Sequence, residues 1–253
     1  MVPDARMQLR KNLRRMLRSL GWDIVRYRPL WPTLLGVERL PIRTVLDIGA
    51  YDGDTARIFR RYFPEAHIYC VEPQPEPVQA LERWAASQQG MVHVLPMALG
   101  NRSGMAEIHR NARFPRIASL ARPAPGLQRQ MQDAITIPTP IMRLDEAVSA
   151  QIPLQEGVLI KIDVEGGERD VLAGGGAALQ RSVACILEFH ADPFFIGDLT
   201  LSEAIPLLKG LGLEYGGVLQ QQLKRNGRLN YFDALFVNWA RGESVASGSA
   251  ARS

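Results

Sequence analysis

The chain has 253 residues, of which 46% are hydrophobic and 22% charged, enough apolar material for one sizeable core and near the upper limit of a single domain. No apolar run approaches the roughly 18 residues of a membrane-spanning helix, and the N-terminus lacks the apolar stretch of a secretory signal, so we expect a soluble cytoplasmic protein. The net charge of +4 gives no sign of a nucleic-acid-binding core, because residues 1–28 hold eight of the 30 Lys and Arg residues but only two of the 26 Asp and Glu residues.

An amphipathic basic helix is predicted over residues 5–20, within an N-terminal arm that spans residues 1–40. Its apolar residues have helical spacing, with arginines at the other positions: Leu9, Leu13, Met16, Leu17 and Leu20. Such a helix could cap the domain or pair with a second subunit in a homo-oligomer. Docking on an anionic membrane surface or an acidic partner is the alternative.

From Thr44 onward, short apolar runs alternate with helical patterns. The runs predict strands over 44–50, 67–73 and 91–100, and the patterns predict helices over 54–63, with Asp54 as N-cap, and 76–87. Cys70 lies within one such strand, where a thiol behaves as a small hydrophobe. Strands of continuous Val, Ile and Leu separated by helices indicate a parallel sheet covered on both faces, so the fold class is doubly wound α/β.

After Gly104 the pattern changes. Residues 105–111 and 134–141 alternate like half-exposed strands, and the segment 111–134 between them has three prolines and four arginines but one acidic residue. A long irregular segment in a compact domain is typically a lid or binding loop, or disordered, and the sequence does not separate these possibilities.

Beyond residue 156 the alternation returns. Strands are predicted over 157–166 and 183–190, the latter with Cys185, helices over 168–175 and 201–212, and a closing strand pair over 213–220 and 232–239. The core domain is therefore predicted to span 41–240. The small, polar tail 241–253 is predicted to be disordered.

The stretch "VLDIGAYDGDT" places a glycine turn after the first strand, where ligands of parallel sheets bind. Gly49 and Gly53 allow close approach of the backbone, but the third glycine of a dinucleotide fingerprint is missing. Asp47, Asp52 and Asp54 around the turn would repel a pyrophosphate. The expected ligand therefore carries positive charge here and no phosphate.

S-adenosylmethionine has these properties. Asp47 can hold its α-amino group, and Glu72, 25 residues later at the end of the second strand, can accept both ribose hydroxyls. The stretch "PMALGN" with Ala98 would line the adenine. The complete set of predicted cofactor residues is Asp47, Gly49, Ala50, Tyr51, Gly53, Asp54, Thr55, Glu72, Pro73, Ala98 and Asp163.

A second group of ionisable residues follows the next two strands. Asp163 and Glu165 alternate at the end of one strand, and Glu188 and His190 at the end of the next, so the four side chains are expected to converge beside the cofactor. Lys161 shares the face of Asp163, and a buried Lys161–Glu188 ion pair is the structural alternative.

Methyl transfer to an alcohol requires approach, orientation and removal of the hydroxyl proton. His190 is the predicted general base, with Asp163 or Glu165 orienting the hydroxyl, although a histidine at a strand end is commonly a surface residue. Alternatively, Asp163, Glu165 and His190 hold Mg²⁺, which lowers the pKa of the hydroxyl. Residues assigned to the acceptor are Glu188, Arg116 and Ser119.

With both groups identified, residues 43–192 resemble the FkbM family of S-adenosylmethionine-dependent methyltransferases. The segments that carry the resemblance are "VLDIGAYDGDT", "VEPQP", "MALGN", "RLDEAV", "LIKIDVEGGERDVLAGG" and "ILEFH". It implies a Rossmann-like, seven-stranded, mostly parallel sheet of order 3-2-1-4-5-7-6 with an antiparallel seventh strand. It also implies roles for Asp47, Gly49, Gly53 and Glu72 in cofactor binding, and for Asp163 and Glu165 in the active site.

Similar proteins methylate hydroxyl groups, often on glycolipids, envelope polysaccharides or polyketides, so O-methylation of a small glycosylated or polyketide molecule is the leading hypothesis. The arginines of 111–134 suggest an anionic acceptor. Methylation of nucleic acid through the basic arm is disfavoured, because "DVEG" stands where base amino-group methyltransferases usually carry a [DN]-P-P-[FY] segment. A binding scaffold without turnover is the third hypothesis.

Overall fold

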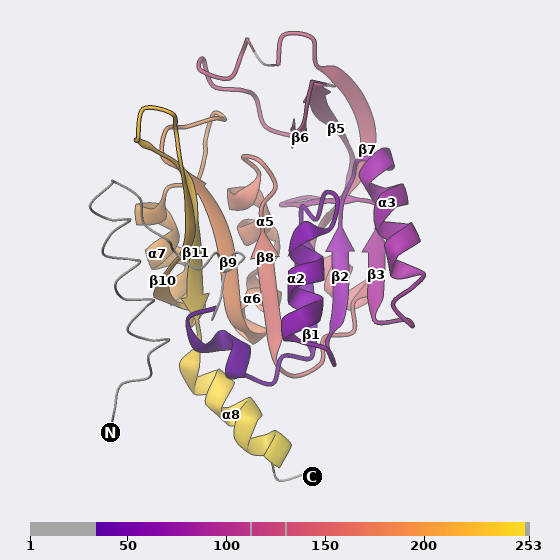
Figure 1. Ribbon diagram of the computed structural model, residues 1–253, viewed down its shortest axis with the longest axis vertical. Helices are drawn as coiled ribbons and strands as arrows, with labels where there is room; N and C mark the ends of the chain where they lie inside the picture. The colour runs from indigo at the N-terminus through magenta and orange to yellow at the C-terminus, as the bar shows by residue number, and fades with distance from the viewer. Residues whose placement is uncertain (1–33, 112, 130, 251–253) are drawn as a thin grey trace, which may run out of the picture. The chain divides into compact units, whose positions relative to one another are not determined.

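The computed structural model describes residues 34–111, 113–129 and 131–250, so the predicted basic helix over 5–20 and most of the 1–40 arm lie outside the described residues. A seven-stranded sheet forms the centre of the described part (Figure 1). Its strands are β1 (Thr44–Ile48), β2 (His67–Val71), β3 (Val92–Leu95), β8 (Val158–Ile162), β9 (Ser182–His190), β10 (Glu214–Leu223) and β11 (Leu229–Val237).

The sheet order is β10-β11-β9-β8-β1-β2-β3, which becomes 3-2-1-4-5-7-6 when these strands are counted along the chain. Strand β11 is antiparallel to both of its neighbours, while the pairs from β9 to β3 are parallel. The predicted doubly wound class and strand order are thus confirmed. All ten residues of the adjacent strands β1 and β8 are buried, as their continuous Val, Ile and Leu runs predict.

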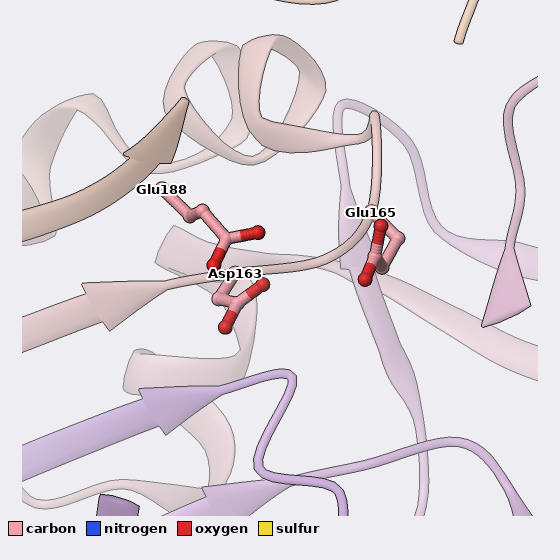
Figure 2. Close-up of side chains that lie close together, drawn as sticks. All are labelled: Asp163, Glu165 and Glu188. Carbon is pink, nitrogen blue, oxygen red and sulfur yellow. The ribbon is translucent and has the colours of Figure 1, made fainter. Parts of the chain in front are cut away.

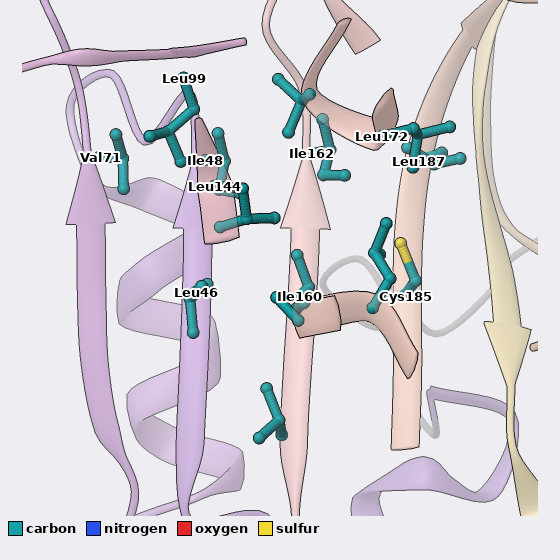
Figure 3. Packing of buried hydrophobic residues seen from close by; sticks show 14 of the residues in the cluster. Leu46, Ile48, Val71, Leu99, Leu144, Ile160, Ile162, Leu172, Cys185 and Leu187 are labelled. Carbon is teal, nitrogen blue, oxygen red and sulfur yellow. The ribbon is translucent and has the colours of Figure 1, made fainter. Parts of the chain in front are cut away.

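Helices cover both faces of this sheet. On one face, apolar residues that alternate along β1, β8 and β9 pack against helices α4 (Leu144–Gln151), α5 (Glu168–Gly174), α6 (Gly176–Arg181) and α7 (Leu201–Gly210), as Figure 3 shows in part. Helices α2 (Asp54–Tyr62) and α3 (Pro75–Ala85) contact β1, β2 and β3. Each fully buried Leu or Ile in such layers stabilises the fold by about 1.5–3 kcal/mol relative to an exposed one.

A second, four-stranded sheet was not predicted. It has the order β4-β7-β5-β6, with β4 (Ala98–Gly100), β5 (Gly104–Asn111), β6 (Phe114–Ser119) and β7 (Ile135–Arg143), and lies at the end of the main sheet to which β1 and β2 point (Figure 1). The single strand predicted over 91–100 is divided between the two sheets. Pro96 separates its halves, and the Met97 N–H bonds to the Leu95 carbonyl across this turn.

The segment 111–134, predicted as a lid or as disorder, contains β6 and a turn that packs on the loop after β9. The Ala124 N–H bonds to the Phe194 carbonyl, and Leu127 and Met131 share a buried cluster with Phe195. Pro123 and Phe195 also form a β-bridge. The described residues of this segment are therefore held by contacts with residues that are distant in sequence.

The predicted disorder of the tail 241–253 is wrong as far as residue 250, because helix α8 covers Trp239–Ala250. Trp239 lies against Gly36 of the short helix η1 (Leu34–Arg39), and Gly242 lies against Leu40. These contacts anchor a segment whose composition alone favours disorder. None of the helices in the described part is long and apolar enough to cross a membrane.

Candidate functional site

The glycine turn joins β1 to α2 in left-handed backbone. Gly49 has φ of 84° and Gly53 has φ of 82°, and Tyr51 between them also has a positive φ, 44°. A Cβ on Gly49 would lie 1.7 Å from the carbonyl oxygen of Asp163, at the end of β8. Gly49 therefore lets two neighbouring strand ends approach each other more closely than any other residue would.

Replacing Gly49 by Ala should lower the free energy of unfolding by at least about 4 kcal/mol, because the added Cβ overlaps backbone that cannot rotate away. Gly90→Ala is the matched control, since Gly90 also has a positive φ, 78°, but nothing within 4 Å of its Cβ position. That change should cost about 1 kcal/mol. Urea unfolding measures both, and similar losses would contradict a steric role for Gly49.

Glu72 follows β2 and reaches back to the glycine turn. One carboxylate oxygen accepts the N–H of Tyr51 at 2.9 Å, and the other accepts the N–H of Gln74 at 2.8 Å. Burial raises the pKa of Glu72 to about 6, against the lowering effect of these hydrogen bonds. Glu72 thus presents a fixed carboxylate whose remaining lone pairs can accept further hydrogen bonds.

Asp47, on β1, is completely buried. Burial raises its pKa to about 6, although the ammonium of Lys161 and the N–H of Ala56 oppose the shift. Neither carboxylate oxygen completes a hydrogen bond with the residues that the structure describes. A buried carboxylate in this condition is suited to a cationic ligand group.

The other two carboxylates of the turn have a protein partner. Arg116, on β6, bonds to Asp52 at 2.6 Å and lies 3.7 Å from Asp54, and its guanidinium stacks over the ring of Tyr51 at 4.6 Å. Arg116, predicted for the acceptor, thus contacts the glycine turn. Asp54 begins α2 but is not its N-cap, which is Gly53. The guanidinium of Arg116 therefore offsets the negative charge of both exposed acids.

The remaining predicted cofactor residues lie around the same turn. Ala50 bonds through its N–H to the Val71 carbonyl, Thr55 is the second residue of α2, Pro73 follows Glu72, and buried Ala98 begins β4. The structure therefore brings the residues from β1, β2 and β4 to one end of the sheet.

The second group converges as predicted. Carboxylate oxygens of Asp163, Glu165 and Glu188 lie within 4.8 Å of one another, and Figure 2 shows Glu188 facing Asp163, with Glu165 on the turn after β8. The Nε2 atom of His190 lies 3.6 Å from Glu188 and 3.8 Å from Glu165. Glu165 has φ of 55°, an unusual conformation for a residue with a side chain and one that is typical of functional turns.

Burial and crowding set the protonation of these acids. Burial, reinforced by nearby Asp163, raises the pKa of Glu165 well above its ordinary value and that of Glu188 to about 10. The raised pKa favours the neutral carboxyl of each residue, which can donate a hydrogen bond as well as accept one. Lys161 bonds to Asp163 at 2.6 Å, so the structural alternative, a Lys161–Glu188 ion pair, is replaced by a Lys161–Asp163 pair. Lys161 thus pairs with Asp163, which lies two residues later in the sequence.

The group that could hold a metal differs from the predicted one. Glu188 takes the place expected for His190 beside Asp163 and Glu165, because the His190 ring stacks on Phe194 with its Nδ1 atom 3.3 Å from Asp198. Three carboxylates match the oxygen ligands that Mg²⁺ prefers.

Two further residues position this turn. Ser119, predicted for the acceptor, donates its hydroxyl to the backbone carbonyl of Glu165. Glu168, read from sequence as a helix start, is buried and accepts the N–H groups of Val164 and Gly166. Asp198 was not predicted as a site residue, because it lies in an irregular loop without a periodic pattern.

The family of the chain follows from a comparison with known protein families. A family model described as the methyltransferase FkbM domain matches residues 47–224. The 2-O-methyltransferase NoeI of Sinorhizobium fredii is 28% identical over 183 residues, which cover 68% of this chain and 74% of NoeI. A crystal structure of an FkbM methyltransferase from Methylobacillus flagellatus is 14% identical with a TM-score of 0.49. The match covers 78% of this chain but only 44% of that one.

Proposed function

The chain belongs to the FkbM family of S-adenosylmethionine-dependent methyltransferases, and from this premise we propose that it methylates a hydroxyl group of a small glycosylated, glycolipid, polysaccharide or polyketide acceptor. The observation that carries the proposal is the convergence of Asp163, Glu165, Glu188 and His190 beside the glycine turn. The relative NoeI bears the name of a 2-O-methyltransferase, which supports oxygen as the methylated atom.

We propose that the cofactor lies across the glycine turn. When bound, S-adenosylmethionine supplies a methyl group on a positively charged sulfur. Asp47 would hold the α-ammonium, for which its buried oxygens are suited, and Glu72 would accept the ribose hydroxyls. The left-handed turn at Gly49 lets the backbone pass close to the ligand.

In the proposed mechanism, Nε2 of His190 takes the proton of the acceptor hydroxyl as its oxygen gains the methyl group, which leaves a methyl ether and S-adenosylhomocysteine. Burial raises the pKa of both Glu188 and Glu165, which favours neutral carboxyl groups that can donate a hydrogen bond to the acceptor and accept one from it. This mixed set of donors and acceptors matches a sugar-like polyol. Several carboxylates in one site disfavour a phosphate-rich acceptor such as nucleic acid.

A methyl-transfer assay tests the proposal. Purified protein is incubated with methyl-labelled S-adenosylmethionine and separate sets of oligosaccharides, glycolipids, polyketide alcohols and oligonucleotides. We expect label in a hydroxyl-bearing acceptor together with one equivalent of S-adenosylhomocysteine. Label in the oligonucleotides alone would contradict the proposal, and cofactor binding without turnover across all sets would favour the scaffold hypothesis.

A divalent cation held by Asp163, Glu165 and Glu188 is a second candidate for activating the hydroxyl, favoured by the closeness of their oxygens. Bound there, it would act as a Lewis acid on the hydroxyl. Dialysis against a chelator, followed by titration with Mg²⁺, separates the two. Loss and recovery of activity would support the cation, and unchanged activity would leave proton removal to His190.

A further inference from the structure

A loop carboxylate lies behind the proposed base, on the side away from the acidic cluster. The Nδ1 atom of His190 is 3.3 Å from Oδ2 of Asp198, and only 8% of the histidine and 9% of the aspartate side chain are exposed. The opposite ring nitrogen, Nε2, faces Glu165 and Glu188. The imidazole therefore spans the distance between Asp198 and the site where the acceptor is proposed to bind.

The loop fixes Asp198 independently of the histidine. The same Oδ2 atom accepts the N–H groups of Phe194 at 2.8 Å and Phe195 at 3.1 Å. Phe195 is fully buried against Leu127 and Met131 of the 111–134 segment. The backbone N–H groups of the loop therefore orient the Asp198 carboxylate, and this orientation does not depend on His190.

The ring of His190 has little freedom to turn. Phe194 stacks on it with ring centroids 4.2 Å apart and an angle of 15° between the planes. An Nδ1–H donated to Asp198 leaves the lone pair of the neutral imidazole on Nε2, where a proton acceptor is needed.

Charge supports the same arrangement. Burial alone would raise the pKa of Asp198, but hydrogen bonds from His190, Phe195 and Phe194 hold it below its ordinary value. Asp198 is thus ionised at neutral pH and favours the imidazolium that forms when a proton arrives. The other titratable groups around His190 are Glu165, Glu188, Glu168 and Tyr231.

We propose that Asp198 is the positioning residue of His190: its carboxylate fixes the tautomer with the lone pair on Nε2 and stabilises the protonated ring during methyl transfer. This inference depends on the proposed function, in which His190 removes the acceptor proton. Asp198 touches neither acceptor nor cofactor and acts only through the histidine.

Replacing Asp198 by Asn tests the charge while keeping an oxygen that can accept all three N–H groups. We expect the acid limb of the kcat/KM profile to move to lower pH by about one unit, since the protonated ring loses its counter-charge. At higher pH, kcat should fall by up to about tenfold, because a base whose pKa is one unit lower removes the proton more slowly. The KM for S-adenosylmethionine should stay unchanged.

Asp192→Asn is the matched control. Asp192 lies in the same loop, but its carboxylate is directed to Lys224 at 2.6 Å, so its pH profile should superimpose on that of the wild type. A profile of Asp198→Asn that also superimposes on the wild type would overturn the inference.

A measurement without turnover separates this inference from the proposed function. The chain has four histidines, so ¹⁵N spectra of labelled protein can be assigned to His190 by loss of its signals in His190→Gln. We expect a protonated Nδ1 in the neutral ring, and a titration of these signals that moves to lower pH in Asp198→Asn. If the spectra behave so but no acceptor is methylated, only the proposed function fails. Signals unaffected by the substitution would overturn the inference.

Discussion

Replacing His190 by Gln should lower kcat at least about 100-fold while the Kd for S-adenosylmethionine stays within about twofold. Gln keeps an N–H that can donate to Asp198 and roughly the same length, but its amide cannot take up a proton. The loss therefore reports proton removal rather than collapse of the loop. Formation of S-adenosylhomocysteine measures kcat, and calorimetric titration measures the Kd.

The control for this change is His109→Gln. His109 lies on β5 and contacts Thr136 within the second sheet, away from the carboxylate cluster, so kcat should be unchanged. A loss of less than tenfold in His190→Gln would remove the histidine from the proton transfer. A cation held by Asp163, Glu165 and Glu188 would then be the remaining candidate for activating the acceptor hydroxyl.

Replacing Glu72 by Gln should weaken binding of S-adenosylmethionine by about 10-fold to 100-fold, the expected effect of losing hydrogen bonds to a charged acceptor. The amide keeps the size of the side chain, yet it offers one accepting oxygen in place of two. Calorimetric titration at pH 7.5 checks the result. Glu76→Gln is the matched control, because Glu76 is an exposed acid on α3 that pairs with Arg110. Equal affinities for wild type and Glu72→Gln would place the ribose elsewhere.

The same carboxylates predict how binding depends on pH. Burial raises the pKa of Asp47 and of Glu72 to about 6, and the proposed contacts require both ionised. As pH falls through 6, protons compete with the cofactor, so the Kd should rise by up to about tenfold per pH unit for each group. Above about pH 7 the Kd should level off. A Kd that stays constant from pH 8 to pH 5 would contradict ionic contacts at these residues.

Local patterns predicted the central part of the fold. Runs rich in Val, Ile and Leu identified β1 and β8, because strands that are buried on both faces are mostly apolar, with Asp47 and Lys161 as buried exceptions that belong to the site. The i, i+2 spacing of Asp163 with Glu165, and of Glu188 with His190, predicted their convergence because parallel strands end at the same edge of a sheet.

Contacts between segments far apart in the sequence were beyond this reasoning. The pairing of β4 with β7 and the stacking of Arg116 on Tyr51 leave no periodic signal in either partner. Helix α8 packs against Leu40 and Gly36, which are distant in sequence. Its own composition favours disorder, so the helix could not be predicted from its residues alone. Asp198 escaped notice for a similar reason, since a single acid in an irregular loop is most often solvated.

The bridge between the 111–134 segment and the loop after β9 affects how this enzyme could diversify. Pro123 pairs with Phe195, and the Ile196 N–H bonds to the Arg122 carbonyl, so the arginine- and proline-rich segment also supports the loop that carries Asp198. An exchange of this segment for one from a relative would change acceptor selectivity and turnover together. To engineer a new acceptor range, the 111–134 segment and the loop after β9 would therefore have to be exchanged together.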